Sequence, residues 1–528
     1  MLKTKIHPRE IYQRCEELGF KNSMQMLTEI IETEEDENKR KEAIKYLSLI
    51  SNNSTSLKED CFKTLENLLI TEDGIEIKCE AAKALGRLEY EKGLKPLKWI
   101  LEQKPVTNQI KLAALKAIQK IKFDEPEIKL FINELSSKFN SVKDFVRIQL
   151  LSLNPEELIN LLLDALKNKN FSNEHKIELI KLIGYELSGI NVSFEDVSYL
   201  KIKYPEILNN LIQFKSTILE VITQILKEED SDLMDSAIII LKVLGKEIEK
   251  DITKLLLLDD FIVKKNAVML CGKLKYSSAV DLLITNLDNI YNEVSIAAIE
   301  ALGEIGDLNA VPDLLDVLDI EDISFEYTDL DFKLYIIDAI KKIYLKNTNP
   351  SYDQLYSHLT KDNITIKESI AFILGELGNE EFVKPLVDLL QIRNLDVKKN
   401  SIIALGKIGT LEPLEHLIKI LNDEEVYWLI KKVVVDAIYN IFQNNWYKIK
   451  DDQDENKRLI TKNMAILNEH LGTKDEEHFK VKLSLIKLLE TYGEKPALNV
   501  LMKRVNDFHR TVRIHASNAI KKIEERLE

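Results

Sequence analysis

The chain repeats one pattern of apolar and polar positions along much of its length. The clearest copy is VKKNSIIALGKIG, which places apolar or small residues at Val397, Ser401, Ala404, Leu405 and Ile408. This spacing of i, i+4, i+7, i+8 and i+11 is typical of a helix with one buried face. The pattern recurs clearly from Val294, Val263, Ile77 and Ile366, and more weakly from Ile110, Leu233, Phe332, Val481 and Val512. The sequence therefore predicts ten related helices, which we call template helices.

A second helix is predicted between successive template helices. Template helices starting at 233, 263, 294, 332, 366 and 397 are 30 to 38 residues apart, which leaves room for one more helix and two short connections. The intervening segments are rich in leucine, and proline stands near the start of five of them, at Pro96, Pro312, Pro385, Pro413 and Pro496. Proline suits the first turn of a helix, where its missing N–H would have had no partner. Each repeat is therefore predicted to be a helical hairpin.

Glycine recurs at the tenth position of the clearest template helices, at Gly86, Gly272, Gly303, Gly375 and Gly406. A glycine inside a helix costs about 1 kcal/mol relative to alanine, so its recurrence in one register needs a physical reason. We expect the neighbouring helix to approach so closely at this position that a side chain would block it.

The segment VSIAAIEALGEIGDLNAVPDLLDVL, from Val294 to Leu318, resembles the HEAT-like repeat found in phycobilisome lyases and many prokaryotic HEAT proteins. The resemblance covers roughly Ile77 to Ile121 and then Leu233 to the C-terminus. It implies an all-α fold, a right-handed α-α superhelix of the HEAT/ARM-like solenoid type with about 12–14 helical hairpins.

The regularity of the repeats divides the chain into four segments. These are 1–140 with N-terminal repeats, 141–230 with divergent helical repeats, 231–445 with regular repeats, and 446–528 with C-terminal repeats. Residues 140–230 lose the alanine and glycine marks. Three stretches, 188–205, 321–331 and 444–456, interrupt the pattern and are predicted to be insertions. Insertions in solenoids map to loops, and the sequence leaves open whether these loops bind anything.

Charge is distributed unevenly along the 528 residues, whose formal net charge is −15. The block from Asp281 to Asp338 holds fifteen acidic residues and one basic residue, Lys333. The C-terminal end leans basic, at Lys503, Arg504, Arg510, Arg513, Lys521, Lys522 and Arg526. An acidic balance disfavours general nucleic-acid binding. The acidic block favours a protein partner with a basic surface.

The sequence shows no motif for catalysis, a metal or a cofactor. The four cysteines, Cys15, Cys61, Cys79 and Cys271, lack the spacing of a zinc site or a disulfide framework. Glu300 and Glu304 are one helical turn apart, and with Asp313, Asp316 and Asp319 they offer carboxylates for a cation, although an acidic surface is the favoured interpretation. No signal peptide and no membrane-spanning segment is apparent. We therefore expect a cytoplasmic protein that is not an enzyme.

The resemblance also indicates which face binds a partner, because the second helix of each hairpin lines the inner surface in HEAT-like solenoids. The template helix occupies that place here, and its outward positions are the seventh and eleventh. The candidate partner-binding residues are Lys83, Arg87, Lys116, Lys120, Met269, Lys273, Glu300, Glu304, Phe372, Glu376, Ile403 and Lys407, together with Asp313 and Asp316 on the following helix. Met269, Phe372 and Ile403 are candidate apolar anchors, unless an adjacent repeat covers them.

A protein-binding scaffold or adaptor is the function that these features favour, because a solenoid spreads surface without forming a deep polar pocket. Two alternatives stay open. One is an accessory role in cofactor attachment, implied by the resemblance to phycobilisome lyases. The other is nucleic-acid binding through the basic ends, as HEAT-like DNA glycosylases do. The sequence leaves the oligomeric state open.

Overall fold

The computed structural model describes the chain except residues 1–5, 191–201, 229, 290, 320–328 and 449–454. The described residues form 31 α-helices and no strand. None of these helices combines the length and the apolar character needed to cross a membrane. The contacts divide the chain into two compact units, Met1–Asp251 and Ile252–Glu528. The all-α solenoid expected from the sequence is confirmed, and the four-segment division stays a prediction.

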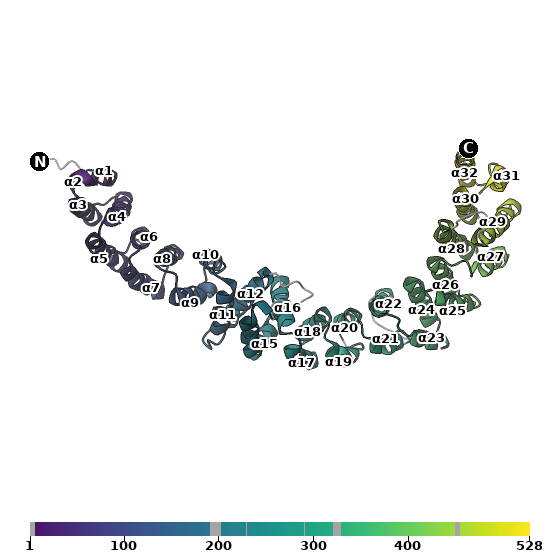
Figure 1. The fold of residues 1–528 in the computed structure, drawn as a ribbon, viewed down its shortest axis with the longest axis horizontal. Helices are drawn as coiled ribbons and strands as arrows, with labels where there is room; N and C mark the ends of the chain where they lie inside the picture. Colours follow the sequence, from purple (N-terminus) through teal and green to yellow (C-terminus); the bar gives the residue numbers. More distant parts are fainter. Residues whose placement is uncertain (1–5, 191–201, 229, 290, 320–328, 449–454) are drawn as a thin grey trace. The chain divides into compact units, whose positions relative to one another are not determined.

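The first unit begins with two short helices and continues as paired helices. Its helices are α1 (Pro8–Gln13), α2 (Cys15–Leu18), α3 (Phe20–Thr33), α4 (Glu37–Ser51), α5 (Thr55–Thr71), α6 (Ile75–Leu88), α7 (Leu94–Glu102), α8 (Asn108–Ile121), α9 (Glu125–Asn133), α10 (Asn140–Leu150), α11 (Pro155–Ala165), α12 (Asn173–Gly189), α14 (Pro205–Gln213), α15 (Lys215–Ile225) and α16 (Ser231–Leu244). Helices α4, α6, α8 and α10 pack in one row, and α5, α7 and α9 lie in the other (Figure 1). Helix α17 (Lys246–Lys254) spans the boundary between the units.

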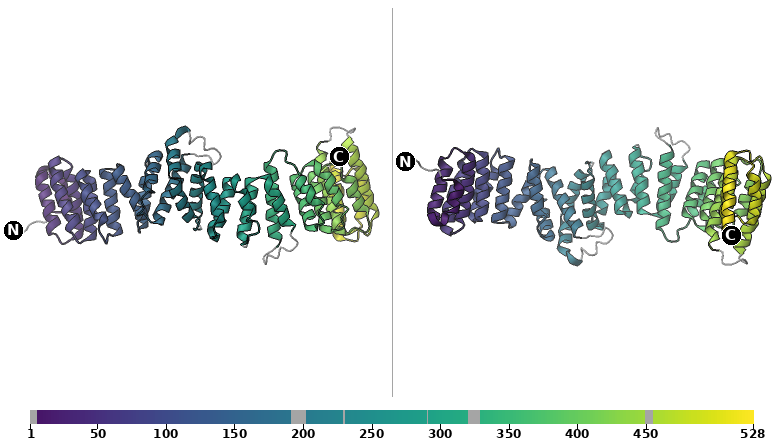
Figure 2. Two further views of the ribbon diagram at one scale, coloured as in Figure 1. Left: turned by 90° about the horizontal axis from the view of Figure 1, so that it is seen from below. Right: turned by 90° about the horizontal axis from the view of Figure 1, so that it is seen from above.

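The second unit repeats the same arrangement. Its helices are α18 (Phe261–Leu274), α19 (Val280–Ile284), α20 (Asn292–Ile305), α21 (Val311–Leu318), α22 (Asp329–Lys346), α23 (Asp353–Leu359), α24 (Ile364–Leu377), α25 (Val383–Leu389), α26 (Leu395–Ile408), α27 (Leu414–Asn422), α28 (Trp428–Trp446), α29 (Glu455–Thr473), α30 (Phe479–Tyr492), α31 (Lys495–Arg504) and α32 (Arg510–Leu527). The even-numbered helices α18 to α32 form the row on the inner side of this unit's curve, which we call the inner row (Figure 1). The odd-numbered helices α19 to α31 form the outer row. Figure 2 shows the helices of the unit standing side by side.

All ten predicted template helices are helices in the structure, and each begins two or three residues before its predicted start. An eleventh helix in the same register, α28, was missed. Its pattern starts at Ile430 and buries Val434, Ala437, Ile438 and Ile441. The signal was present, because Ala437 stands at the eighth position, but the tenth position holds Tyr439 instead of glycine.

The close approach predicted at the tenth-position glycines is confirmed. A Cβ added to Gly406 would lie 2.8 Å from the Cα of Ala437 in the next helix of the inner row. Gly86, Gly272, Gly303 and Gly375 face the alanines Ala117, Ala301, Ala339 and Ala404 in the same way, with Cβ to Cα distances of 2.7–2.9 Å. Since real Cβ contacts are longer, glycine and alanine together set how near adjacent template helices pack.

The divergent segment retains one such contact, contrary to the expectation that residues 140–230 lack the glycine mark. A Cβ on Gly184 of α12 would lie 2.8 Å from the Cα of Ser236 in α16. Ser236 is at the fourth position of its template helix, so this contact is displaced by about one helical turn from the others. The sequence analysis compared only the tenth position of each helix and therefore missed the Gly184–Ser236 contact.

The predicted role of proline holds with small shifts in position. Pro312 and Pro496 lie at the second position of α21 and α31, and Pro413 is the N-cap of α27. Pro96 and Pro385 are the third residues of α7 and α25. All five therefore stand at the N-cap or in the first turn, where their missing N–H removes no hydrogen bond within the helix.

The boundaries of the predicted insertions need correction. Residues 188–189 belong to α12, 329–331 to α22, and 444–446 to α28. Helix α28 continues because the buried Asn445 donates from Nδ2 to the carbonyl oxygens of Gly409 and Ile441, both at 2.7 Å. Residue 205 begins α14, and residues 455–456 begin α29. Most of the remaining insertion residues, 191–201, 321–328 and 449–454, lie outside the described residues.

Candidate binding surface

The template helices of the second unit bury one stripe and leave the seventh and eleventh positions facing outward. In α20, Val294, Ala298 and Leu302 are fully buried, whereas Glu300 at the seventh position is exposed. Glu304 at the eleventh position is half-buried, and Lys273 at the eleventh position of α18 is exposed. We call the outward side of the inner row the inner face.

The three apolar residues of this face differ in their exposure. Met269 is 40% exposed, whereas Phe372 and Ile403 are half-buried. The Lys407 ammonium lies 5.1 Å from the centre of the Phe372 ring, a cation–π contact that covers one side of the ring. Met269 is therefore the most accessible of the three predicted anchors.

Ion pairs between neighbouring helices use several of the predicted binding residues. Glu304 of α20 pairs with Lys342 at 3.3 Å and with Lys346 at 3.1 Å, both on α22. Burial raises the pKa of Glu304, but the hydrogen bonds from the two lysines outweigh it and leave the pKa below its ordinary value. These contacts tie successive inner-row helices together.

Glu376 of α24 makes a second such connection. It pairs with Lys407 of α26, and with Lys341 of α22 at 3.8 Å. The hydrogen bond from Lys407 holds the pKa of Glu376 below its ordinary value. A partner that engaged Glu376 or Lys407 would therefore have to compete with this pair.

The acidic block is partly neutralised by lysines that flank it in sequence. Its paired carboxylates are Glu293 with Lys265, Glu304 with Lys342 and Lys346, Asp316 and Asp319 with Lys361, and Asp338 with Lys341 and Lys342. Of the predicted binding residues in the block, Glu300 and Asp313 make no ion pair with a described residue. Glu300 is therefore the predicted inner-face carboxylate of α20 that no described lysine neutralises.

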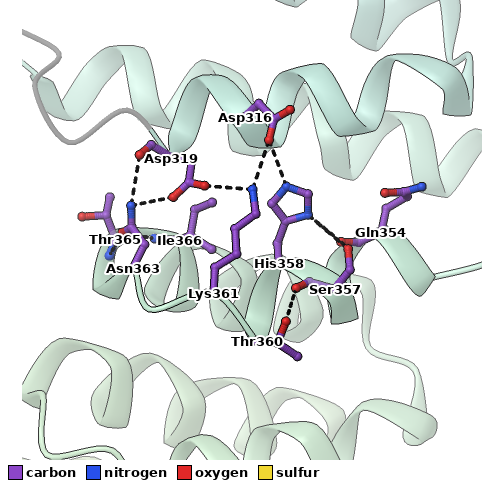
Figure 3. Close-up of polar contacts among 10 residues, drawn as sticks. All are labelled: Asp316, Asp319, Gln354, Ser357, His358, Thr360, Lys361, Asn363, Thr365 and Ile366. Carbon is purple, nitrogen blue, oxygen red and sulfur yellow. Dashed lines mark hydrogen bonds and ion pairs between the residues drawn. The ribbon is translucent and has the colours of Figure 1, made fainter.

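Asp316 lies on the outer-row helix α21 and Asp319 is the C-cap of that helix, and their side chains face α23 and the turn that follows it (Figure 3). Lys361 bridges the two carboxylates, at 3.1 Å from Asp316 Oδ1 and 2.8 Å from Asp319 Oδ2. Asn363 Nδ2 donates to Asp319 Oδ1 at 2.8 Å. The disfavoured alternative, in which these carboxylates join Glu300 and Glu304 around a cation, does not fit this arrangement, because a lysine and an asparagine already bind Asp316 and Asp319. The described part of the chain contains no group of three His, Cys, Asp or Glu side chains suited to a metal ion.

His358 completes this cluster from α23. Its Nδ1 lies 2.9 Å from the carbonyl oxygen of Gln354, and its Nε2 lies 3.2 Å from Asp316 Oδ1 (Figure 3). Both neighbours are acceptors, and the buried ring lies between them. Burial raises the pKa of Asp316, but the hydrogen bonds from His358 and Lys361 leave it lowered overall.

The predicted basic residues of the first unit lie on α6 and α8. Arg87 pairs with Glu80 at 2.7 Å, and Lys83 lies 3.5 Å from the same carboxylate. Lys116 lies 5.6 Å from the centre of the Phe145 ring, and Lys120 is exposed. Glu80 therefore reduces the positive charge that the sequence predicted for α6.

The sequence analysis missed an open cavity of about 480 Å³ on the inner face of α28, α30 and α32. Its lining residues are Lys432, Asp436, Tyr439, Asn440, Lys480, Leu483, Ser484, Lys487, Glu490 and His515. Asp436, Asn440 and Lys487 stand at the seventh or eleventh positions of α28 and α30. Recognition of α28 as a template helix would have identified the first two.

The two rows of helical hairpins define an α-helical repeat solenoid. Residues 251–324 and 352–438 match the family of HEAT repeats, which confirms the resemblance found in the sequence over these two stretches. Comparison with curated proteins gives no match.

Similar solved structures match at low identity and low TM-score. Importin beta, crystallised in a polyethylene glycol condition, is 11% identical with a TM-score of 0.43, over 98% of this chain and 77% of its own. A Kap121p mutant is 11% identical with a TM-score of 0.40, over 98% and 71%. The complex of CpcE and CpcF of phycocyanin lyase from Nostoc sp. PCC7120 is 17% identical with a TM-score of 0.22, over 60% and 94%. Likenesses at these scores say nothing of what this chain binds.

Proposed function

We propose that this HEAT-repeat protein is a binding scaffold or adaptor whose inner face, in the second unit, receives a protein partner with a basic patch. One observation carries the proposal. Met269 and Glu300 occupy the seventh position of the adjacent helices α18 and α20, which pack together through Gly272 and Ala301. At the same register of two adjacent helices they present an exposed apolar side chain and a carboxylate that makes no ion pair with a described residue.

An apolar contact flanked by an unpaired charge suits protein recognition. The apolar side chain provides burial, and the charge selects a partner of opposite sign. Lysine and arginine side chains of a partner would find Glu300 without displacing a lysine of this chain. The paired carboxylates Glu304 and Glu376 instead maintain the shape of the face.

The proposal is tested by capturing partners from the native cell with the purified full chain as bait. The test variant is Glu300→Lys, and the matched control is Asp388→Lys, which makes the same charge change at an exposed residue of the outer-row helix α25. Proteins that the wild-type chain retains should be lost with Glu300→Lys and kept with Asp388→Lys. Equal retention by both variants would exclude the inner face around Glu300 as the contact.

Neither alternative function is supported by a comparable observation. Cofactor attachment and nucleic-acid binding through the basic ends remain predictions from the sequence. A tetrapyrrole titration followed by absorbance tests the first, and a gel shift with DNA or RNA at low salt tests the second.

A further inference from the structure

In the cavity on α28, α30 and α32, the carboxylates are ion-paired within the chain, whereas two of the lysines are not. Its two carboxylates are already engaged. Asp436 pairs with Lys432 at 2.6 Å and accepts a hydrogen bond from Ser484 Oγ at 2.9 Å. Glu490 pairs with Lys522. The acids of the cavity therefore hold the chain's own cations and have little capacity for a cationic ligand.

The other two lysines of the cavity make no ion pair with a described residue. The Lys480 ammonium lies 5.1 Å from the centre of the Trp428 ring, and the Lys487 ammonium lies 4.9 Å from the centre of the Tyr439 ring. An aromatic ring attracts the ammonium and holds it over the ring face, but it accepts no strong hydrogen bond. Both lysines thus keep N–H donors for a ligand.

The other polar groups of the cavity carry no resolved charge into it. His515 Nδ1 donates its N–H to the Thr511 carbonyl oxygen, 2.8 Å away. Asn440 is exposed and offers an amide, which can donate or accept a hydrogen bond. The two lysines without an acidic partner therefore set the charge of the site, and they complement carboxylates.

We infer that this cavity binds an acidic, extended segment of a protein partner through Lys480 and Lys487. The two lysines are seven residues apart on α30, which corresponds to about 10 Å along the helix axis. An extended peptide advances about 3.3–3.6 Å per residue, so carboxylates about three positions apart match the lysine spacing. The inference rests on the proposed scaffold function and adds a second, oppositely charged contact to it.

Binding to defined peptides tests the inference. The full chain is titrated into fluorescein-labelled peptides of repeated Glu-Gly-Ser, Gln-Gly-Ser or Lys-Gly-Ser triplets, and fluorescence polarisation gives each Kd. The variant Lys480→Ala with Lys487→Ala is compared with Lys462→Ala with Lys503→Ala, which removes the same charge from exposed residues of α29 and α31. Thermal melts by circular dichroism check that both variants fold.

We expect the glutamate peptide alone to bind, and the cavity variant to raise its Kd at least about tenfold while the control changes it little. Carbodiimide coupling should link the glutamate peptide to Lys480 and Lys487, as mass spectrometry would show. Equal binding of the glutamine peptide, equal effects of the two variants, or tighter binding of a phosphoserine peptide or polyuridine RNA would each overturn the inference. Since Glu300 lies outside the cavity, failure here with retained Glu300-dependent capture would leave the proposed function standing.

Discussion

Lys482 Nζ and Asp507 Oδ2 lie 2.8 Å apart between α30 and the turn before α32, and both side chains are buried, at 6% and 3% exposure. Arg504 approaches the same carboxylate oxygen at 3.5 Å. Burial raises the pKa of Asp507, but the hydrogen bond from Lys482 and the nearby charges leave it lowered. The last repeats are thus joined by a buried carboxylate, Asp507, and the positively charged side chains of Lys482 and Arg504 around it.

Removal of the carboxylate charge should therefore destabilise the second unit. Asp507→Asn leaves the buried Lys482 without its counter-ion, whereas Arg504 keeps its ion pair with Asp475 at 2.6 Å. We expect a loss of about 3–5 kcal/mol in the free energy of unfolding, measured with urea. Glu424→Gln is the matched control, since it breaks the more exposed Glu424–Lys474 pair. Adding Lys482→Met to Asp507→Asn should recover part of the loss. Equal urea midpoints for Asp507→Asn and Glu424→Gln would contradict this account.

The packing of glycine on alanine predicts that a single methyl group disturbs the inner row. Gly406→Ala improves helix propensity by about 1 kcal/mol, but its Cβ would collide with Ala437. We expect a net loss of about 1–2 kcal/mol in the free energy of unfolding. Gly189→Ala is the control, because no atom of a described residue lies within 4 Å of its added Cβ. A stabilised Gly406→Ala variant would show that the two helices do not pack this closely.

At the C-terminal ends of two template helices, an asparagine side chain donates a hydrogen bond to a glycine carbonyl oxygen. Asn445 donates to the Gly409 carbonyl at 2.7 Å, and Asn347 donates to the Gly306 carbonyl at 2.8 Å. Asn445→Leu leaves that carbonyl without its partner, so we expect a loss of about 1–3 kcal/mol in urea unfolding. Gln443→Leu, at an exposed position of the same helix, should cost little. If both leucine variants unfold alike, the hydrogen bond has no net effect on stability.

The cluster around Lys361 predicts a dependence of stability on pH. Hydrogen bonding to Lys361 lowers the pKa of Asp319, and contacts with His358 and Lys361 leave the pKa of Asp316 lowered, both from an ordinary value of 3.8. Groups with lowered folded pKa values stabilise the fold above the ordinary value, and this stabilisation is lost as the pH falls through the folded values.

The measurement compares urea midpoints of the wild type and Lys361→Met at pH 7 and near the acid limit of folding. The wild type should be the more stable at pH 7, and the difference should shrink as the pH falls below about 3.8. Lys384→Met, which removes an exposed lysine of α25, should show no such trend. A difference in urea midpoint between the wild type and Lys361→Met that stays constant with pH would show that titration of Asp316 and Asp319 is not its cause.

The fold was predictable because it depends on local pattern. Ala and Gly mark the closely packed side of each template helix, so residues such as Ala404 and Gly406 carry the geometry of the repeat in the sequence. Helix α28 escaped detection because Tyr439 replaces the glycine. The Gly184–Ser236 contact escaped because its register is shifted.

The side-chain contacts of the candidate surface were not predictable in the same way. Asp316 and Lys361 are separated by 45 residues, and their pairing depends on how two outer-row helices stack. The pairs Glu304–Lys346 and Glu376–Lys407 likewise join successive repeats. Charge counted along the chain therefore overstated the free negative charge of the acidic block, since lysines from the flanking repeats neutralise part of it.

The proposed role of the inner face is tested most directly by cross-linking mass spectrometry on partners captured from the native cell. We expect cross-links to fall on inner-row helices, close to Glu300 and Lys273 in one region and to Lys480 and Lys487 in another. Cross-links confined to the outer row, or to residues 191–201, 321–328 and 449–454, would contradict the account.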